Sequence, residues 1–468
     1  MRSGKSVSPG AVEGPISGGS GRPFVASTVF DLARVGYCEA EYILSGRAAA
    51  YTSAAQLAND GRWTVAPGQA ADYRTRLVVY RPIERRRFNG TVVVEWLNVS
   101  GGLDAAPDWT MAHIQLIRGG FVWVGVSAQK VGVEGGVTPL GMPAMPLKTV
   151  DPQRYGSLVH PGDSFSYDIF SQAAGAIRQP GLGVLGDLRI ERVIAVGESQ
   201  SAFRLVTYIN AVHPSADVYD GFLVHSRGDV GAPLSEPPQP VITVPSGLPI
   251  RDDLNVPVLV FQTETDLTLL GSFAARQPDG ARFRLWEVAG TAHADTYTVG
   301  VGATDVGDSP DVANLVLTTT PVPGLEVNKP INSGPQHFVL KAALAALNAW
   351  VRRGTPPPPA PRLAVSAGPP VAIVRDAHGN AVGGIRTPQL DVPIATLSGD
   401  GDGASLLAAL FGHTAPFDAG KLTALYPDHE AYVSAFETAT ERAVRAGFIL
   451  PPDAELMKAA AAGSAIGR

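Results

Sequence analysis

Short apolar runs alternate with amphipathic segments between residues 75 and 351. Runs this short, rich in valine and bounded by turn residues, predict strands that are buried on both faces of a sheet. We expect strands at 75–81, 91–97, 121–126, 192–196, 221–225, 256–262 and 283–288. The amphipathic segments predict helices at 109–118, 167–178, 202–212 and 338–351, with Asp163 or Ser164 as the N-cap of the second. This alternation indicates an α/β fold with a mostly parallel central sheet and helices on both faces.

Long segments rich in proline and glycine interrupt the alternation at 131–162 and 226–255. Each follows the carboxyl end of a predicted strand. Ligands of open α/β sheets bind outside those ends. We therefore expect both insertions to form a lid over the functional site.

The two ends of the chain depart from the pattern as well. Residues 1–22 are rich in glycine and serine and predict a flexible N-terminal arm. Gly354 and the prolines after it end the last predicted helix of the main domain, which we place at 23–354. Residues 355–468 predict a C-terminal subdomain, helical and irregular, docked on the main domain.

Composition narrows the classes of protein. The 468 residues carry a net charge of −6 without a block of five or six basic residues, which argues against nucleic-acid partners and polybasic membrane anchors. Residues 1–21 lack the apolar core of a signal peptide, and no apolar run reaches the roughly 18 residues of a membrane span. We expect a soluble, cytoplasmic protein, with secretion still open and the oligomeric state undetermined. The single cysteine, Cys38, excludes an internal disulfide and is interpreted as a buried small hydrophobe.

The strand at 192–196 leads into Gly197-Glu198-Ser199-Gln200-Ser201 and then into a predicted helix. A serine on a sharp turn between strand and helix is typical of a nucleophile elbow. The positions two before and two after the serine must be small, and Gly197 and Ser201 meet that demand, although Ser201 stands where glycine is usual. The alternative, a serine that only caps the helix, leaves the small flanking residues unexplained.

A serine nucleophile needs a histidine base and an acid that orients the histidine. Asp266 follows the strand at 256–262, and His293 follows the strand at 283–288. The order serine, acid, histidine is that of the α/β-hydrolase triad. Glu264 is an alternative acid. His337 is the rival histidine, and we expect it to cap or pack a helix instead.

The oxyanion of the reaction needs two backbone N–H donors. One donor is expected at Gln200, directly after the serine, and the other at Asn98 or Val99, in the loop after the strand at 91–97. Gly101 and Gly102 are expected to let that loop approach a substrate. His225, at the end of another strand, is expected to contact substrate or to serve the structure.

Four stretches resemble the α/β-hydrolase superfamily, and more narrowly the large bacterial proteins known as α/β-hydrolase-domain proteins. These stretches are 94–102, 197–202, 262–266 and 332–337. The resemblance covers roughly residues 25–455. It implies the α/β-hydrolase fold and carboxylic-ester hydrolysis by Ser199 and His293, and it implies no particular substrate.

Together these observations predict a serine esterase that works through a triad and an acyl-enzyme, without a cofactor or a metal. Its partner would be a small-molecule ester with an apolar group, because Leu140, Met142, Met145 and Leu147 lie in the first insertion. Acyl transfer or amide hydrolysis by the same triad stays open, and so does a hydrolase-like binding module without turnover.

Overall fold

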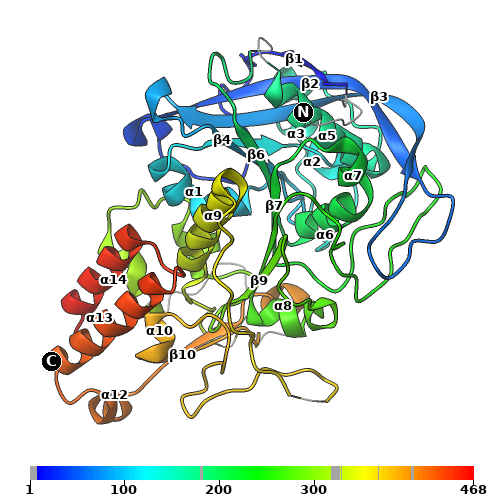
Figure 1. Ribbon diagram of the computed structural model, residues 1–468. Coiled ribbons are helices and arrows are strands. Elements are labelled where there is room, and N and C mark those ends of the chain that lie inside the picture. The colour runs from blue at the N-terminus through cyan, green and yellow to red at the C-terminus, as the bar shows by residue number, and fades with distance from the viewer. Residues whose placement is uncertain (1–7, 180–182, 318–326, 328, 367, 402–404) are drawn as a thin grey trace.

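The computed structural model describes residues 8–179, 183–317, 327, 329–366, 368–401 and 405–468. Within these residues a nine-stranded sheet forms the centre of the molecule, in the order β1-β2-β3-β5-β4-β6-β7-β8-β9 (Figure 1). The strands are β1 Ala11–Glu13, β2 Tyr37–Thr52, β3 Ala66–Pro82, β4 Thr91–Trp96, β5 Val122–Val126, β6 Arg192–Glu198, β7 Gly221–His225, β8 Val258–Gln262 and β9 Phe283–Glu287. Each predicted strand overlaps one of them.

Strands β4 to β9 are parallel to their neighbours in that group, whereas β1, β2 and β3 pair antiparallel. The predicted mostly parallel sheet is therefore confirmed. Every residue of β4, β7 and β8 is buried. Parallel strands reach this state when helices cover both faces of the sheet, and it explains why they are continuous apolar runs in the sequence.

Helices cover both faces of the sheet. The main ones are α1 Pro107–Arg118, α5 Ser166–Arg178, α6 Gln200–Thr207 and α9 Gln336–Arg353. Val92 and Val94 of β4 belong to the hydrophobic core under α5 and α6, whereas Val93 belongs to the core under α1 and α9. Successive side chains of a strand point to opposite faces, so a single apolar strand serves both cores.

The remaining helices are short or lie in the connections and the C-terminal region. They are α2 Lys130–Glu134, α3 Leu147–Val150, α4 Pro152–Tyr155, α7 His213–Ala216, α8 Glu264–Thr268, α10 Pro388–Asp391, α11 Leu406–Ala409, α12 Ala419–Leu425, α13 His429–Arg445 and α14 Pro451–Gly463. The 3-10 and π-helical turns are η1 Leu32–Val35, η2 Arg85–Arg87, η3 Asp163–Phe165, η4 Tyr208–Val212, η5 Ser272–Ala275, η6 Tyr297–Val301 and η7 Pro310–Leu317. None of the helices within the described ranges is both long and apolar enough to cross a membrane.

The predicted N-cap of α5 is wrong. The turn η3 occupies Asp163 to Phe165, and α5 begins after it without a capping side chain. The carboxylate of Asp163 instead accepts the backbone N–H of Lys130 at 2.7 Å and pairs with Arg204 of α6 at 3.1 Å. Asp163 thus links the two flanks of the first insertion to the helix that follows the serine.

The N-terminal segment differs from the expected flexible arm over its described part. β1 pairs with β2 in the sheet. The carbonyl of Gly18 accepts a hydrogen bond of 2.7 Å from the guanidinium of Arg154. Residues 1–7 of the predicted arm lie outside the described residues.

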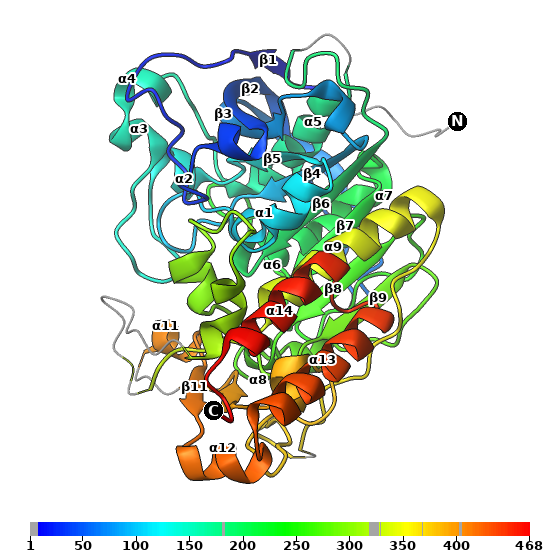
Figure 2. The same cartoon turned by 90° about the vertical axis from the view of Figure 1, so that its left-hand side faces the viewer.

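The C-terminal helix α14 lies beside α9, and α13 packs against α14 (Figure 2). Both share the hydrophobic core of α1 and α9. A two-stranded sheet of β10 Ala395–Ser398 and β11 His413–Pro416 precedes them. Asp453 of α14 is fully buried and receives a bidentate pair from Arg118 at 3.1 and 3.2 Å. The ammonium of Lys341, in α9 and also buried, lies 3.5 Å from the same carboxylate. The division into a main domain and a docked subdomain stays a prediction.

We expect Asp453→Asn to lower the free energy of unfolding by about 3 kcal/mol, because it leaves the charge of Lys341 buried without its partner. Urea unfolding followed by circular dichroism measures the loss. The matched control is Glu441→Gln, which removes the surface pairs with Arg445 and Lys458 and should change little. Adding Lys341→Met to Asp453→Asn should restore part of the loss. A loss below about 1 kcal/mol for Asp453→Asn would contradict this role of the cluster.

Candidate active site

Ser199 occupies a sharp turn between β6 and α6. Its backbone φ is 56° and its ψ is −121°, a conformation that residues with a side chain rarely adopt. The Ser199 N–H donates to the His225 carbonyl at 2.9 Å, which ties the turn to the end of β7. The strand-turn-helix geometry predicted for this serine is present.

Strand and helix nearly touch beside the turn. A Cβ built on Gly197 would lie 3.1 Å from the Cβ of Ser201 and 3.0 Å from Leu205. Both distances are tighter than nine in ten real Cβ contacts, so a side chain at position 197 would press on the helix. Ser201 is fully buried, and its hydroxyl has no hydrogen-bond partner among the described residues. The side chain fits where glycine is usual, at the cost of a buried hydroxyl without a partner.

The structure brings Ser199, His293 and Asp266 together. The Ser199 Oγ lies 2.8 Å from His293 Nε2, and His293 Nδ1 lies 2.7 Å from Asp266 Oδ1. His293 is 6% exposed and Asp266 is fully buried. A hydroxyl, an imidazole and a carboxylate in this sequence can deprotonate the hydroxyl and hold the imidazole in one tautomer.

A local motif positions the acid. Thr263, at the end of β8, caps helix α8, and its hydroxyl accepts the N–H of Asp266. The second carboxylate oxygen of Asp266 accepts the Thr263 N–H at 2.7 Å. This reciprocal capping box holds the Asp266 carboxylate through bonds that do not involve His293.

The two charged forms support each other. Burial by itself disfavours both the carboxylate and the imidazolium. For Asp266, the hydrogen bond and charge of His293 outweigh burial, and the pKa lies below its ordinary value. For His293, the hydrogen bond to Asp266 and the negative charges of Glu198 and Asp266 outweigh burial and raise its pKa.

The alternative acid, Glu264, is not placed with His293. Its carboxylate accepts the N–H groups of Gly290 at 2.5 Å and Gly399 at 3.0 Å. It also pairs with Arg375 at 3.1 Å. Because Gly290 belongs to the loop that carries His293, Glu264 holds that loop in place.

The side chains of the two other candidate histidines are engaged elsewhere. His225 is fully buried between Asp108, 2.9 Å from its Nδ1, and Gln336, 3.0 Å from its Nε2. It lines no part of the cavity beside Ser199, so the expected substrate contact is not seen and the structural alternative fits. His337 is buried and stacks on Tyr297 at 3.7 Å between ring centroids, as expected of a packing residue.

The predicted oxyanion loop is present but only partly as expected. The Asn98 N–H already donates to the Ala105 carbonyl at 2.8 Å, so it cannot also bind an oxyanion. The Val99 N–H has no acceptor among the described residues. Gln200 is the first residue of α6, where the N–H groups have no acceptor within the helix.

The two glycines of this loop do not contact the cavity. Gly102 has a φ of 84°, and a Cβ there would lie 2.5 Å from the Pro143 carbonyl. Its carbonyl accepts the N–H of Met145 at 2.7 Å. Gly102 therefore admits the first insertion rather than a substrate, and Gly101 is exposed.

A cavity of about 520 Å³ opens above Ser199 and His293. Its wall is largely apolar and contains no lysine or arginine among the described residues. Besides Ser199 and His293, its polar lining residues are Ser27, Asn98, Ser100, Thr110, Glu198 and Thr298. The apolar wall consists mainly of Val25, Val29, Met111, Leu140, Val299, Leu407, Leu410 and Phe411.

The insertions contribute unequally to this wall. Leu140 of the first insertion lines the cavity, whereas Met142 and Met145 are 45% exposed and Leu147 is buried in a separate cluster. The described residues of the second insertion contribute no lining side chain. They pack beside α6, where Glu236 pairs with Arg204 at 2.7 Å. Roofing by 226–255 is therefore not seen.

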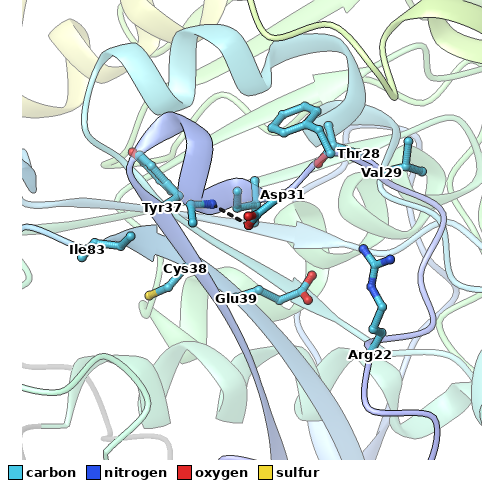
Figure 3. Close-up of a pocket in the computed structure, with 11 residues that line it drawn as sticks. Arg22, Thr28, Val29, Asp31, Tyr37, Cys38, Glu39 and Ile83 are labelled. Carbon is cyan, nitrogen blue, oxygen red and sulfur yellow. Dashed lines mark hydrogen bonds between the residues drawn. The ribbon is translucent and has the colours of Figure 1, made fainter.

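A second cavity, of about 590 Å³, lies beside the start of β2 (Figure 3). Its wall includes Arg22, Asp31, Cys38 and Glu39 and contains no histidine or serine among the described residues. The thiol of Cys38 and the carboxylate of Glu39 point away from each other (Figure 3). Cys38 is partly exposed, which corrects the expectation of a buried hydrophobe.

Comparisons with known proteins give the family. The model of the family described as "Alpha/beta hydrolase domain" matches residues 12–459. Over 199 residues the chain is 26% identical to a probable serine/threonine-protein kinase of Corynebacterium efficiens, covering 40% of this chain and 26% of that protein. The chain spans about a quarter of that relative's length.

Solved structures with distant similarity include esterases. One from Rhizomucor miehei is 11% identical with a TM-score of 0.32, covering 60% of this chain and 81% of that one. A serine hydrolase without a lid from Xanthomonas campestris is 13% identical with a TM-score of 0.28, covering 46% and 78%. A glucuronoyl esterase from Solibacter usitatus is 9% identical with a TM-score of 0.28, covering 54% and 76%.

TM-scores this low carry no argument about the site. The family match spans nearly the whole chain, including the serine turn and the residues that surround it. The protein belongs to the family of the alpha/beta hydrolase domain.

Proposed function

We propose that the protein is a serine esterase that hydrolyses a carboxylic ester through an acyl-enzyme. The observation that carries the proposal is the continuous contact from Ser199 Oγ through the His293 ring to Asp266, at 2.8 and 2.7 Å. All three residues follow the carboxyl ends of parallel strands, and Ser199 and His293 line the cavity. Family membership supports a hydrolase, and the triad geometry supports the ester chemistry.

The proposed reaction has two halves. His293 Nε2 takes the Ser199 proton as Ser199 Oγ bonds to the ester carbonyl carbon, and the carbonyl electron pair moves to the oxygen. The N–H groups of Gln200 and Val99 stabilise that oxyanion. The oxyanion electron pair then re-forms the carbonyl, the bond from that carbon to the alkoxy oxygen breaks, and the imidazolium gives its proton to the leaving alcohol. Water, activated by His293 in the same way, releases the acid from the serine.

The cavity wall supports a neutral, apolar substrate. Side chains such as Met111, Leu410 and Phe411 offer dispersion contacts but no charge. The described wall contains no cation that would pair with a substrate carboxylate, and it contains the acidic Glu198. Burying an unpaired charge there would cost several kcal/mol.

We expect Ser199→Ala to lose at least about a thousandfold in kcat, because nothing else in the site replaces the nucleophile. Hydrolysis of a 4-nitrophenyl ester measures the loss. Circular dichroism establishes that the variant is folded. A fluorophosphonate probe should label the natural chain and not the variant. Full activity in a folded Ser199→Ala protein would exclude the mechanism, and absence of both labelling and turnover in the natural chain would favour a binding module.

The acid can be tested with a matched pair of buried aspartates. We expect Asp266→Asn to lower kcat by about ten-thousandfold, because the amide favours the wrong histidine tautomer. Asp295→Asn is the control. Asp295 is also fully buried and lies two residues from His293, but its bonds go to Thr298. Kinetics on one ester decide the assignment, and equal losses in both variants would refute it.

Substrate charge can be tested at constant chain length. We expect kcat/KM for 4-nitrophenyl hexanoate to exceed that for the 4-nitrophenyl monoester of adipic acid by at least about tenfold, because the second acyl chain ends in a carboxylate without a partner in the wall. Initial rates at neutral pH measure both constants. Equal values would contradict a neutral acyl site.

A further inference from the structure

The triad leaves one acidic side chain of the site without a role. Glu198 Oε1 lies 3.3 Å from His293 Nε2, the same nitrogen that contacts Ser199 Oγ. Glu198 lines the cavity, yet it is only 8% exposed. The reacting nitrogen of His293 therefore has two neighbours, the serine hydroxyl and this carboxyl group.

Asn98 holds the carboxyl group in position. Its side-chain N–H donates to Glu198 Oε2 at 3.2 Å and to the Glu198 carbonyl at 3.0 Å. Oε1 is thereby left to face the histidine. Asn98 belongs to the loop expected to bind the oxyanion, and its side chain orients Glu198 although its N–H is already engaged.

The surroundings of Glu198 are mixed in charge. Burial raises its pKa to about 7, while His293 and His225 lower it and Asp108 and Asp266 raise it. These groups come from the loop after β9, the end of β7, α1 and α8 respectively. Above neutral pH the side chain carries a negative charge, directly beside the atom that becomes positive during the reaction.

We propose that Glu198 is a second acidic partner of His293, which stabilises the imidazolium from the Nε2 side while Asp266 stabilises it from the Nδ1 side. This inference rests on the proposed function. Glu198 takes no proton in the step. The Ser199 proton moves to Nε2, the new N–H is shared between the departing oxygen and Glu198 Oε1, and that proton then leaves with the alcohol.

The sign of the effect on pH dependence follows from charge. Neutral His293 is the base, so kcat/KM falls as pH drops through the histidine pKa. The negative charge of Glu198 favours the imidazolium and helps raise that pKa. Without the charge, neutral His293 persists to lower pH, but the transition state loses stabilisation. The acid limb of the pH profile therefore shifts to lower pH, while the plateau value of kcat falls.

The test is Glu198→Gln, with kcat and kcat/KM for one neutral ester measured from pH 5 to 9. We expect the acid limb to move down by about one pH unit and the plateau of kcat to fall about tenfold. Glu198→Asp keeps the charge on a shorter side chain, and its acid limb should return toward that of the natural chain. Asp295→Asn, which removes a buried carboxyl without contact to Nε2, should leave the limb in place.

Two outcomes would overturn the inference. One is a lower plateau with an unmoved acid limb in Glu198→Gln, which indicates a structural role. The other is a Glu198→Asp profile that matches Glu198→Gln, which shows that charge is not the cause. If Glu198→Gln fails to fold, Glu198→Asp serves as the test. Its kcat must be lower than that of the natural chain, and its acid limb must lie at lower pH. Ser199→Ala keeps the two proposals apart, because its inactivity supports the esterase whatever Glu198 does.

Discussion

The positive φ of Ser199 is the constraint on which the site depends. A side chain in that conformation costs about 1–3 kcal/mol and persists only where its surroundings enforce it. Here β6 is hydrogen-bonded between β4 and β7, and the Ser199 N–H is bound to His225. Because Gly197 and Ser201 are small, the helix can begin close beside the end of the strand. The hydroxyl is therefore aimed by the fold before any substrate arrives.

Buried polar groups around the triad hold the remaining geometry. The capping box fixes Asp266, and Glu264 binds the loop that carries His293. His225, with Asp108 on one ring nitrogen, supports the serine turn from below. Burial of such polar groups carries a desolvation penalty. Hydrogen bonds offset that penalty, and they do so only in one arrangement of the side chains. Hydrogen bonds therefore fix the conformation of the site loops, as they fix the strands that precede them.

The sequence indicated the parts of the site that follow from strand ends. Ser199 comes directly after a parallel strand, Asp266 and His293 follow within a few residues of one, and those strand ends meet at one edge of the sheet. The sequence alone could not decide between Asp266 and Glu264. Both lie in α8, and only the three-dimensional structure shows which side chain points toward His293. The strand β2 escaped the pattern because its exposed positions break up the apolar ones.

Other features had no local signal at all. The cavity wall gathers residues from 25–29, 298–303 and 407–411, which only tertiary packing brings together. Gly102 was expected to face a ligand, but the neighbour that needs its space is Pro143. Glu198 stands inside the recognised motif, yet its importance depends on its side-chain direction and on Asn98. The spacing of residues in the sequence does not reveal side-chain rotamers or burial of this kind.

The cavity wall has a consequence for how such an enzyme can diverge. The proposed reacting groups come from 199–293, whereas much of the apolar wall comes from outside that span, at Val25, Val29, Leu407, Leu410 and Phe411. Exchanges at those five positions alter the shape offered to a substrate while the hydrogen bonds among Ser199, His293 and Asp266 stay untouched. In the proposed esterase, substrate selectivity and reactivity are therefore encoded in different parts of the chain, and the first can change without loss of the second.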